Sequence, residues 1–312
     1  MTNTQLTIII PFLNEGKEIA NTLSSIQDTA TGMPAILLIN DASTDGYNYR
    51  TVAEQYNCDY IQHEERLGVA ESRNEGVRTC NTPYFLLLDG HMRFYEKGWD
   101  EKLLALLQEN PRTILCGQTK KLLRNENGEI VEGEHKTCYG AYIDMSEVRI
   151  FKAAWNYTDP TPYTPLSEIP CILGAAYACS KEYWLYLRGL EGLRYYGLDE
   201  ELLSLKVWCE GGRCLLVKDW IVGHIYRSEF PYEVPSKEIV YNRMLVIELF
   251  LPYELKRKAY LRIKNACEDI FIEVYDMLKA NYPVIKDMKE YIQSISQRNI
   301  EFFFEKNHGT LS

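Results

Sequence analysis

Short apolar runs alternate with longer amphipathic segments in the first third of the chain. Leu6–Ile10, Ala35–Ile39 and Tyr84–Leu88 have the length and composition of buried strands. Lys17–Gln27 and Val69–Thr79 carry apolar residues at helical spacing. This alternation predicts an α/β fold with a Rossmann-like, mostly parallel central sheet flanked by helices. Two weaker elements fit the same alternation, namely a helix through Val52 and Tyr56 and a short strand near Tyr60.

The pattern is less regular in the second half of the chain. Asn125–Gly128 has the composition of a hairpin turn, and the four prolines of Thr158–Pro170 predict a loop over the sheet. Helical spacing returns in Glu200–Cys209 and again from Ser236 onward. The chain is therefore expected to end in helices.

A length of 312 residues suits one large α/β domain with a modest extension. We expect the domain to cover residues 1–235 and a helical C-terminal extension, packed on this core, to cover residues 236–312. The formal net charge is -10 and no long basic run occurs, so nucleic acid is not an expected partner. The nine cysteines form no CxxC pair, which argues against a zinc site and favours reduced, buried thiols.

The first residues show no signal-peptide pattern, and no apolar run approaches the ~20 residues that a membrane helix needs. We therefore expect a cytoplasmic protein whose contact with a membrane, if it has one, is peripheral. The sequence leaves the oligomeric state open.

Polar residues follow the predicted strands directly. Pro11, Asp41 and Asp89 all lie where strands end, and ligands bind at the carboxyl ends of the strands in such sheets. Asp89 and His91 are two residues apart, so both side chains can reach one ion, and a carboxylate with an imidazole suits Mn²⁺. A polar turn after a strand is the commoner origin of such a triplet. His224 follows a second apolar run and gains weight only as a partner of this pair.

Other charged residues have both a structural and a chemical interpretation. Arg73 lies in a predicted helix after a glycine turn, a position that suits a diphosphate but also an ordinary solvated side chain. Asp199, Glu200 and Glu201 begin a predicted helix, where the helix dipole favours acidic residues. The chemical interpretation is that one of them is a general base or orients the acceptor hydroxyl.

Four segments along the chain carry a recognisable set of motifs, namely LTIIIPFLNE, ILLINDASTDG, ERLGVAESRNEG and FLLLDGHMRF. Together they resemble the signature of family 2 glycosyltransferases, which have the GT-A fold. The chain is most similar to the catalytic domain of polypeptide N-acetylgalactosaminyltransferases. Their Asp-x-His metal motif matches Asp89 and His91, and their Val-Gly-His segment matches the third metal ligand, His224. Two later stretches, GLDEELLSLKVWCEGGRCLLV and VGHIYRSEFPYEVP, resemble further blocks of that family.

The resemblance implies that the metal is Mn²⁺ or Mg²⁺ and that the donor is a UDP-sugar. Asp41 would accept the uracil N3–H, and Asp89 would contact the ribose as well as the metal. Arg227 would stabilise the departing UDP. The resemblance assigns the remaining positions to nucleotide-sugar binding: Pro11, Glu15, Arg73, Gly174, Ala175 and Tyr232.

The chain departs from that family at several site positions. Tyr196, Leu198 and Phe230 replace a Trp, a Gly and a His, and the pair Asp199-Glu200 replaces Glu-Asn. These changes leave the sugar, the acceptor and the stereochemistry open. Because a carboxylate stands where the retaining family has Asn, we favour inversion, with Glu200 as the base and Asp199 orienting the acceptor.

The sequence therefore predicts a metal-dependent glycosyltransferase that moves a sugar from a UDP-sugar to an acceptor hydroxyl in surface glycan or polysaccharide synthesis. The acceptor is a glycan, a lipid-linked sugar or a peptide. One alternative is a retaining N-acetylgalactosaminyltransferase-like enzyme acting on a protein, and another is an inactive nucleotide-sugar-binding protein. A nucleotidyltransferase is disfavoured, because PFLNEGKE lacks the Gly-rich, basic phosphate loop of that class.

Overall fold

The computed structural model describes residues 4–134, 136–146, 151–227 and 229–307 of the chain. The first part alternates strands and helices as the sequence predicts, and α3 and β4 have the predicted bounds. Its elements are β1 (Leu6–Phe12), α1 (Glu18–Thr29), β2 (Ala35–Asn40), α2 (Tyr49–Gln55), β3 (Asp59–Gln62), α3 (Val69–Thr79), β4 (Tyr84–Leu88), β5 (Met92–Phe94) and α4 (Trp99–Glu109).

The second part contains the remaining strands and two helices. They are β6 (Thr113–Arg124), β7 (Ile130–Glu132), β8 (Ala141–Asp144), β9 (Lys152–Trp155), β10 (Leu166–Glu168), β11 (Ala176–Ser180), α5 (Lys181–Tyr186), α6 (Asp199–Glu210) and β12 (Arg213–Ile225). The chain then continues through α7 (Ser236–Phe250), α8 (Tyr253–Ala266), α9 (Glu268–Ala280), α10 (Tyr282–Ile295) and α11 (Ile300–Asn307).

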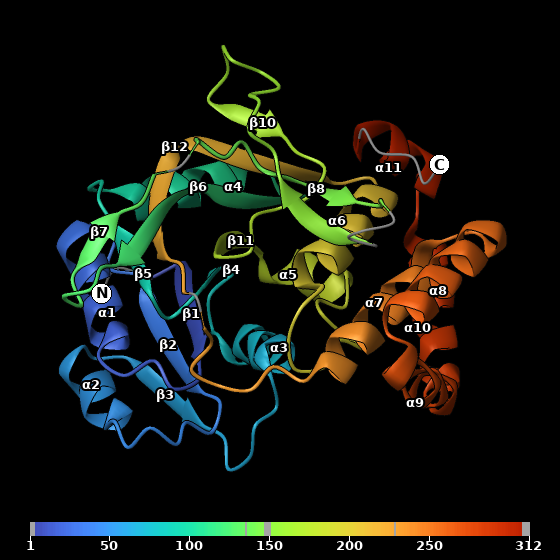
Figure 1. The fold of residues 1–312 in the computed structure, drawn as a ribbon. Coiled ribbons are helices and arrows are strands. Elements are labelled where there is room, and N and C mark those ends of the chain that lie inside the picture. The colour runs from blue at the N-terminus through green and yellow to red at the C-terminus, as the bar shows by residue number, and fades with distance from the viewer. Residues whose placement is uncertain (1–3, 135, 147–150, 228, 308–312) are drawn as a thin grey trace.

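The central sheet has the strand order β10-β12-β6-β11-β4-β1-β2-β3, with β5 paired to β12 and β7 to β6 (Figure 1). β3, β2, β1 and β4 are parallel, as expected of strands joined by helices. β11 is antiparallel to both β4 and β6, and β10 is antiparallel to β12, so the sheet is mixed. The carboxyl ends of β1, β2 and β4 therefore meet the start of β11 at one edge.

Two local expectations have different outcomes. The hairpin turn at Asn125–Gly128 is confirmed, because β6 and β7 pair on either side of it. The loop expected over Thr158–Pro170 is wrong in part, since Leu166–Glu168 pairs with β12 as the edge strand β10. A strand of three residues between Pro165 and Pro170 is too short to give a strand pattern in the sequence.

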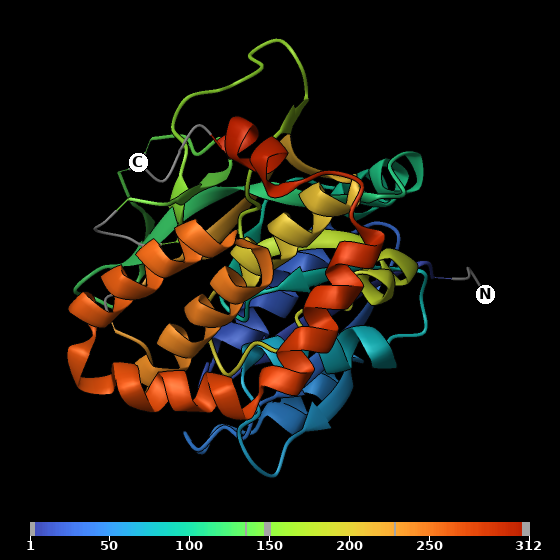
Figure 2. The same ribbon diagram turned by 90° about the vertical axis from the view of Figure 1, so that its right-hand side faces the viewer.

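Apolar side chains alternate between the two faces of the sheet and form two cores. In β1, Ile8 and Ile10 pack with α1, α2 and α4, whereas Ile9 packs with α3, α5 and α6. The apolar residues of α7, α9 and α10 belong to the same core as Ile9. The C-terminal helices thus pack on one face of the domain (Figure 2). Within the described ranges, no helix combines the length and the apolar character needed to cross a bilayer.

Candidate functional site

Asp89, His91 and His224 come together at the carboxyl edge of the sheet. Asp89 directly follows β4, and His91 directly precedes β5. His224 lies in β12, where it is paired with Met92 of β5, and the carbonyl of His91 accepts a hydrogen bond from the backbone of Ile225 at 3.2 Å. Strand pairing therefore brings the two sequence motifs together. One ligand atom from each of the three side chains lies within 4.8 Å of the others.

The protonation states in this cluster suit a divalent cation. Burial opposes ionisation of Asp89, but the hydrogen bond from His224 and the charge of Arg73 lower the pKa of Asp89 to about 2. Burial lowers the pKa of His224, so its imidazole is neutral at pH 7 and can donate a lone pair to a metal. Within the described part of the chain, Nδ1 of His224 is buried and makes no hydrogen bond. A carboxylate with two imidazoles, one of which has a buried Nδ1 without a partner, fits a metal site.

Glu15 lies beside this cluster because Gly90 has no side chain. A Cβ at Gly90 would lie 3.0 Å from Cγ of Glu15 and 2.9 Å from Ile19. The Glu15 carboxylate accepts hydrogen bonds from both terminal nitrogens of Arg227 and lies 3.2 Å from Nδ1 of His91. Burial opposes its ionisation, but His91 and Arg227 lower its pKa. Arg227 is therefore held at the edge of the Asp/His/His cluster by a carboxylate.

Arg73 connects the two acidic parts of the site. Its guanidinium donates hydrogen bonds to Asp199 at 2.8 Å and to Asp89 at 3.0 Å, and it lies 3.4 Å from the carbonyl oxygen of Gly174. The side chains of Arg73 and Asp199 are only 6% and 4% exposed, so their ion pair is shielded from solvent, whereas Asp89 is 27% exposed. Gly174 and Ala175 reach this place because they precede β11, and the Ala175 carbonyl accepts a hydrogen bond from the backbone of Asp89 at 3.0 Å.

The helix α6, whose first residues are carboxylates, begins after a turn that the C-terminal helices hold in place. Leu198 has a left-handed conformation, with a φ of 69°, directly before Asp199. Asn242 of α7 is fully buried, and its side chain accepts a hydrogen bond from the backbone N–H of Arg194 and donates one to the carbonyl of Arg194. Its amide also donates to the carbonyls of Tyr196 and Gly197. A side chain of the C-terminal extension thus fixes the approach to α6.

Glu200 and Glu201 lie in an environment that favours their neutral forms. Burial raises the pKa of Glu200, and the neighbouring charges of Glu201 and Asp199 raise it further. Burial also raises the pKa of Glu201, although its Oε1 accepts a hydrogen bond from the backbone of Ala153 in β9 at 2.5 Å. This bond joins β9 to the first turn of α6.

Asp41 is buried and organises the loop before α3. Its Oδ1 accepts hydrogen bonds from Nδ1 of His63 and from the backbone of Leu67, and its Oδ2 accepts one from the backbone of Gly68, all at 2.8 Å. Nε2 of His63 lies 2.6 Å from Glu75. One lone pair of Oδ2 remains for a further donor, and recognition of uracil by Asp41 stays a prediction. Pro11 is buried in β1 beside this loop, paired with Ile39 of β2.

The segment after β12 lies across the site. Asn14 donates a hydrogen bond to the carbonyl of Pro231 at 3.2 Å, and Arg66 donates one to the carbonyl of Glu233 at 2.6 Å. The Arg66 guanidinium also lies over the ring of Tyr232, 5.0 Å from its centroid. The ring of Phe230 contacts Tyr196 edge to face at 5.4 Å. Residues 229–233 thus cover the space between β1 and the loop before α3.

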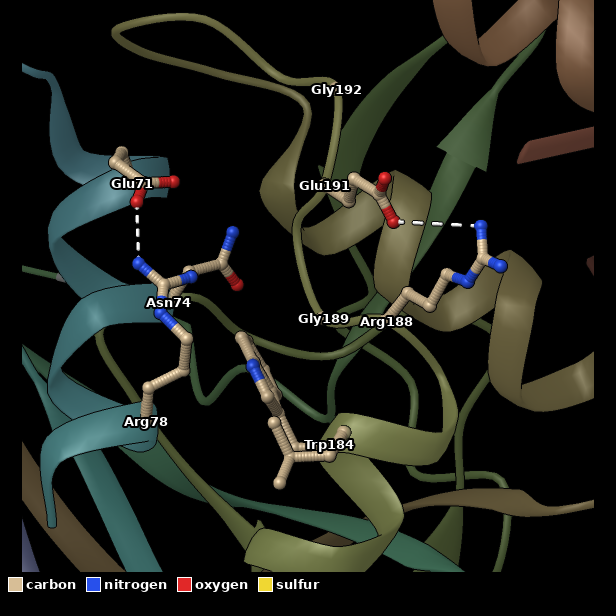
Figure 3. A pocket seen from close by; sticks show the side chains of 9 residues that line it. Glu71, Asn74, Arg78, Trp184, Arg188, Gly189, Glu191 and Gly192 are labelled. Atoms are coloured by element: carbon tan, nitrogen blue, oxygen red, sulfur yellow. Dashed lines mark hydrogen bonds and ion pairs between the residues drawn. The ribbon is translucent and has the colours of Figure 1, made fainter. Parts of the chain in front are cut away.

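A cavity of about 620 Å³ lies elsewhere, between α3, α5 and the loop after α5 (Figure 3). None of its lining residues is a predicted site residue. Arg78 pairs with Glu71 at 2.6 Å, and Arg188 lies 3.9 Å from Glu191 and 2.7 Å from Asp287. Because carboxylates balance both guanidiniums, this cavity does not present the net positive charge that a diphosphate would need.

Solved structures place this fold among known enzymes. The crystal structure of GalNAc-T7 with UDP, GalNAc and Mn²⁺ superposes with a TM-score of 0.77 at 20% identity, covering 97% of this chain and 56% of that one. Staphylococcus aureus TarS 1–349 in complex with UDP-GlcNAc gives a TM-score of 0.54 at 14% identity, over 98% of this chain and 91% of that one. The chain therefore has the GT-A fold, with the Asp/His/His cluster at the carboxyl edge of its sheet.

The sequence comparisons find similarity to glycosyltransferases. Residues 7–153 match the model described as glycosyl transferase family 2. Polypeptide N-acetylgalactosaminyltransferase 11 of Xenopus tropicalis is 25% identical over 245 residues, which are 73% of this chain and 39% of that protein. Human polypeptide N-acetylgalactosaminyltransferase 3 is 24% identical over 302 residues, which are 89% of this chain and 46% of that protein. The chain therefore spans less than half the length of these relatives.

Proposed function

We propose that this protein transfers a sugar from a UDP-sugar to an acceptor hydroxyl in the synthesis of a surface glycan, and that it needs a divalent metal, Mn²⁺ in preference to Mg²⁺. The observation that carries the proposal is the convergence of Asp89, His91 and His224 within 4.8 Å, with the pKa values of Asp89 and His224 both lowered. The bound metal would act as a Lewis acid on the leaving diphosphate.

The side chains around the metal ligands have complementary tasks in this proposal. Arg73 keeps Asp89 ionised and oriented through an ion pair. Arg227 leaves Glu15 and binds the diphosphate of the departing UDP. The exchange is favourable because the diphosphate carries more negative charge than the single carboxylate of Glu15. The covering segment after β12 excludes water and so limits hydrolysis of the donor. Glu200 takes the proton of the acceptor hydroxyl, and Asp199 orients the acceptor.

Other assignments from the sequence remain predictions. Asp41 recognises uracil, and Pro11, Gly174, Ala175 and Tyr232 line the donor site. The division into residues 1–235 and 236–312 and a cytoplasmic location also remain predictions. A retaining N-acetylgalactosaminyltransferase-like enzyme that acts on a protein or peptide is the second candidate function, because the relatives above are named polypeptide N-acetylgalactosaminyltransferases.

Release of UDP tests the proposal. The protein is incubated with a panel of UDP-sugars without an acceptor, and UDP is quantified with Mn²⁺, Mg²⁺, Ca²⁺ or excess chelator. We expect slow hydrolysis of one donor that is lost with chelator and best restored by Mn²⁺. His224→Ala should reduce the rate by about 10²-fold or more, since the metal supplies several kcal/mol of charge stabilisation. Asp219→Asn, at an exposed carboxylate, is the matched control. Full activity in chelator would refute the metal requirement, and no release from any donor would favour an inactive binding protein.

A further inference from the structure

Four aromatic or imidazole rings lead outward from the metal cluster to the surface. The ring of His224 contacts Tyr226 edge to face at 4.3 Å, and Tyr226 contacts Trp155 at 5.3 Å with an angle of 73° between the rings. Trp155 in turn contacts Tyr157 at 6.5 Å and 90°. Trp155 and Tyr157 are 44% and 49% exposed, which is unusual for large aromatic side chains next to a buried polar site.

The backbone around Trp155 is tied to both sides of the site. On one side, the bond from Ala153 to Glu201 joins β9 to the turn of α6 that carries Asp199 and Glu200. On the other side, Tyr226 links Trp155 to the metal ligand His224. Trp155 is therefore positioned relative to both the metal ligands and the proposed base. A molecule stacked on Trp155 would therefore place some of its groups near the proposed position of the acceptor hydroxyl.

The surface around Trp155 suits a sugar ring. Edge-to-face contacts with Tyr226 and Tyr157 fix the orientation of the indole, and its face carries the negative part of the ring quadrupole. The C–H bonds on one side of a pyranose are weakly positive and lie in a plane, so they pack flat on such a face. The tyrosine hydroxyls nearby can exchange hydrogen bonds with sugar hydroxyls.

The same surface is less suited to binding an extended peptide. A peptide that adds to a sheet needs a free strand edge. One edge of β9 pairs with β8, and on the other edge the N–H of Ala153 is already bonded to Glu201. The backbone after β9 is also engaged, because Asn156 bonds to Gly140 at 2.8 Å and to Tyr139 at 2.7 Å.

We propose that Trp155, with Tyr157 and Tyr226, forms a stacking platform for a sugar residue of a carbohydrate acceptor. This inference rests on the proposed function, because it places the platform on the acceptor side of the donor and metal site. It narrows the acceptor to a carbohydrate, in which the stacked ring is the one that carries the reacting hydroxyl or its neighbour.

Saturation-transfer NMR tests the platform directly. The probes are methyl glycosides of glucose, galactose, N-acetylglucosamine and N-acetylgalactosamine, disaccharides of these sugars, and a set of Ser/Thr peptides. Samples contain UDP and Mg²⁺, which does not broaden the signals. We expect saturation of the C–H protons on one face of a pyranose, with binding at least about 10-fold weaker in Trp155→Ala. Trp155→Phe should keep most of the affinity because it keeps a flat ring. Tyr253→Ala, at a 70% exposed aromatic side chain on α8, is the matched control and should bind like wild type.

Two results would overturn the platform. One is that no sugar of the panel shows saturation that depends on Trp155, and the other is that a peptide shows this dependence instead. Thermal melting of each variant identifies a loss of binding that comes from unfolding, and Trp155→Phe then carries the test. Metal-dependent release of UDP from wild type is measured separately. Failure of that assay with stacking intact would refute the proposed transfer reaction and not the sugar site.

Discussion

The methyl group that Gly174 lacks would occupy the space that Glu200 uses. A Cβ built on Gly174 lies 2.6 Å from Cδ of Glu200 and 3.1 Å from its Cγ, and the nearer carboxylate oxygen is closer still. Non-bonded carbon atoms keep about 3.5–4.0 Å apart. In Gly174→Ala, the Glu200 carboxylate must therefore withdraw by roughly 1 Å, and the substitution moves the proposed base without removing it.

The expected losses in rate and in stability differ in size. A misplacement of about 1 Å in a reacting group can cost on the order of 10²-fold in rate, so we expect kcat to fall about 100-fold. The clashing atoms are the far end of a flexible side chain, which can swing aside. The free energy of unfolding should therefore fall by only about 1 kcal/mol, at the low end of overpacking costs.

The assay is product formation at saturating UDP-sugar and Mn²⁺, with thermal melting measured on the same samples. In a double-mutant cycle, Gly174→Ala should cost much less when Glu200→Gln is already present, because both changes act on one carboxylate. Gly128→Ala is the control for kcat, since Gly128 has nothing within 4 Å of its Cβ position and lies in the β6–β7 hairpin; its φ of +82° means that this variant loses stability without moving Glu200. A Gly174→Ala enzyme within about threefold of the wild-type kcat would refute the role of Glu200 as a base.

Three further perturbations test other parts of the site. Burial alone would lower the pKa of His63, but its bonds to Asp41 and Glu75 raise it. The charged form of His63 therefore stabilises the fold below about pH 6.5, and this contribution is lost as the pH rises through the pKa of the folded state. His63→Gln should remove that step from urea denaturation measured between about pH 6 and pH 9, and an unchanged pH profile would contradict the raised pKa. Asn242→Ala should lower the free energy of unfolding by about 2–4 kcal/mol because buried backbone groups lose partners, and a melting temperature within about 1 °C of wild type would contradict this. With Mn²⁺, UDP should raise the melting temperature more than GDP or ADP, and Asp41→Ala should abolish this preference; equal shifts in wild type would mean that the site reads only the phosphates.

The first half of the fold could be predicted from the sequence because each element there has a strong local signal. Ile8, Ile9 and Ile10 are fully buried on both faces of the sheet, which gives β1 its continuous apolar run. The direction of β11 had no such signal. It enters between β4 and β6 through a loop rather than a helix, and nothing in the five residues Ala176–Ser180 indicates which way the strand runs.

The cluster of Asp89, His91 and His224 could be predicted because its residues lie in short motifs, whereas the contacts of the residues around it could not. Arg66, His63 and Asn242 act through contacts with segments 22 to 167 positions away in the chain. Arg66 lies in the motif ERLGVAESRNEG, but only the folded chain shows what these three side chains contact. Trp155 was missed for a related reason, since an isolated aromatic residue in a short strand is ordinary until its exposure beside Tyr226 is known.

The environment of Glu200 gives the stereochemical question a measurable form. If Glu200 is the base of an inverting displacement, it must lose a proton that burial and its acidic neighbours hold, because they raise its pKa. The transfer rate should then rise with pH across neutrality, and Glu200→Gln should remove this dependence and reduce kcat by roughly 10²–10⁴-fold. The product from an α-linked UDP-sugar would be β-linked, as read from its anomeric coupling by NMR. A retaining reaction needs no side-chain base, because the departing phosphate can accept the proton. An α-linked product together with a Glu200→Gln enzyme nearly as fast as wild type would therefore refute inversion, and the raised pKa of Glu200 would then be a consequence of its burial in the first turn of α6.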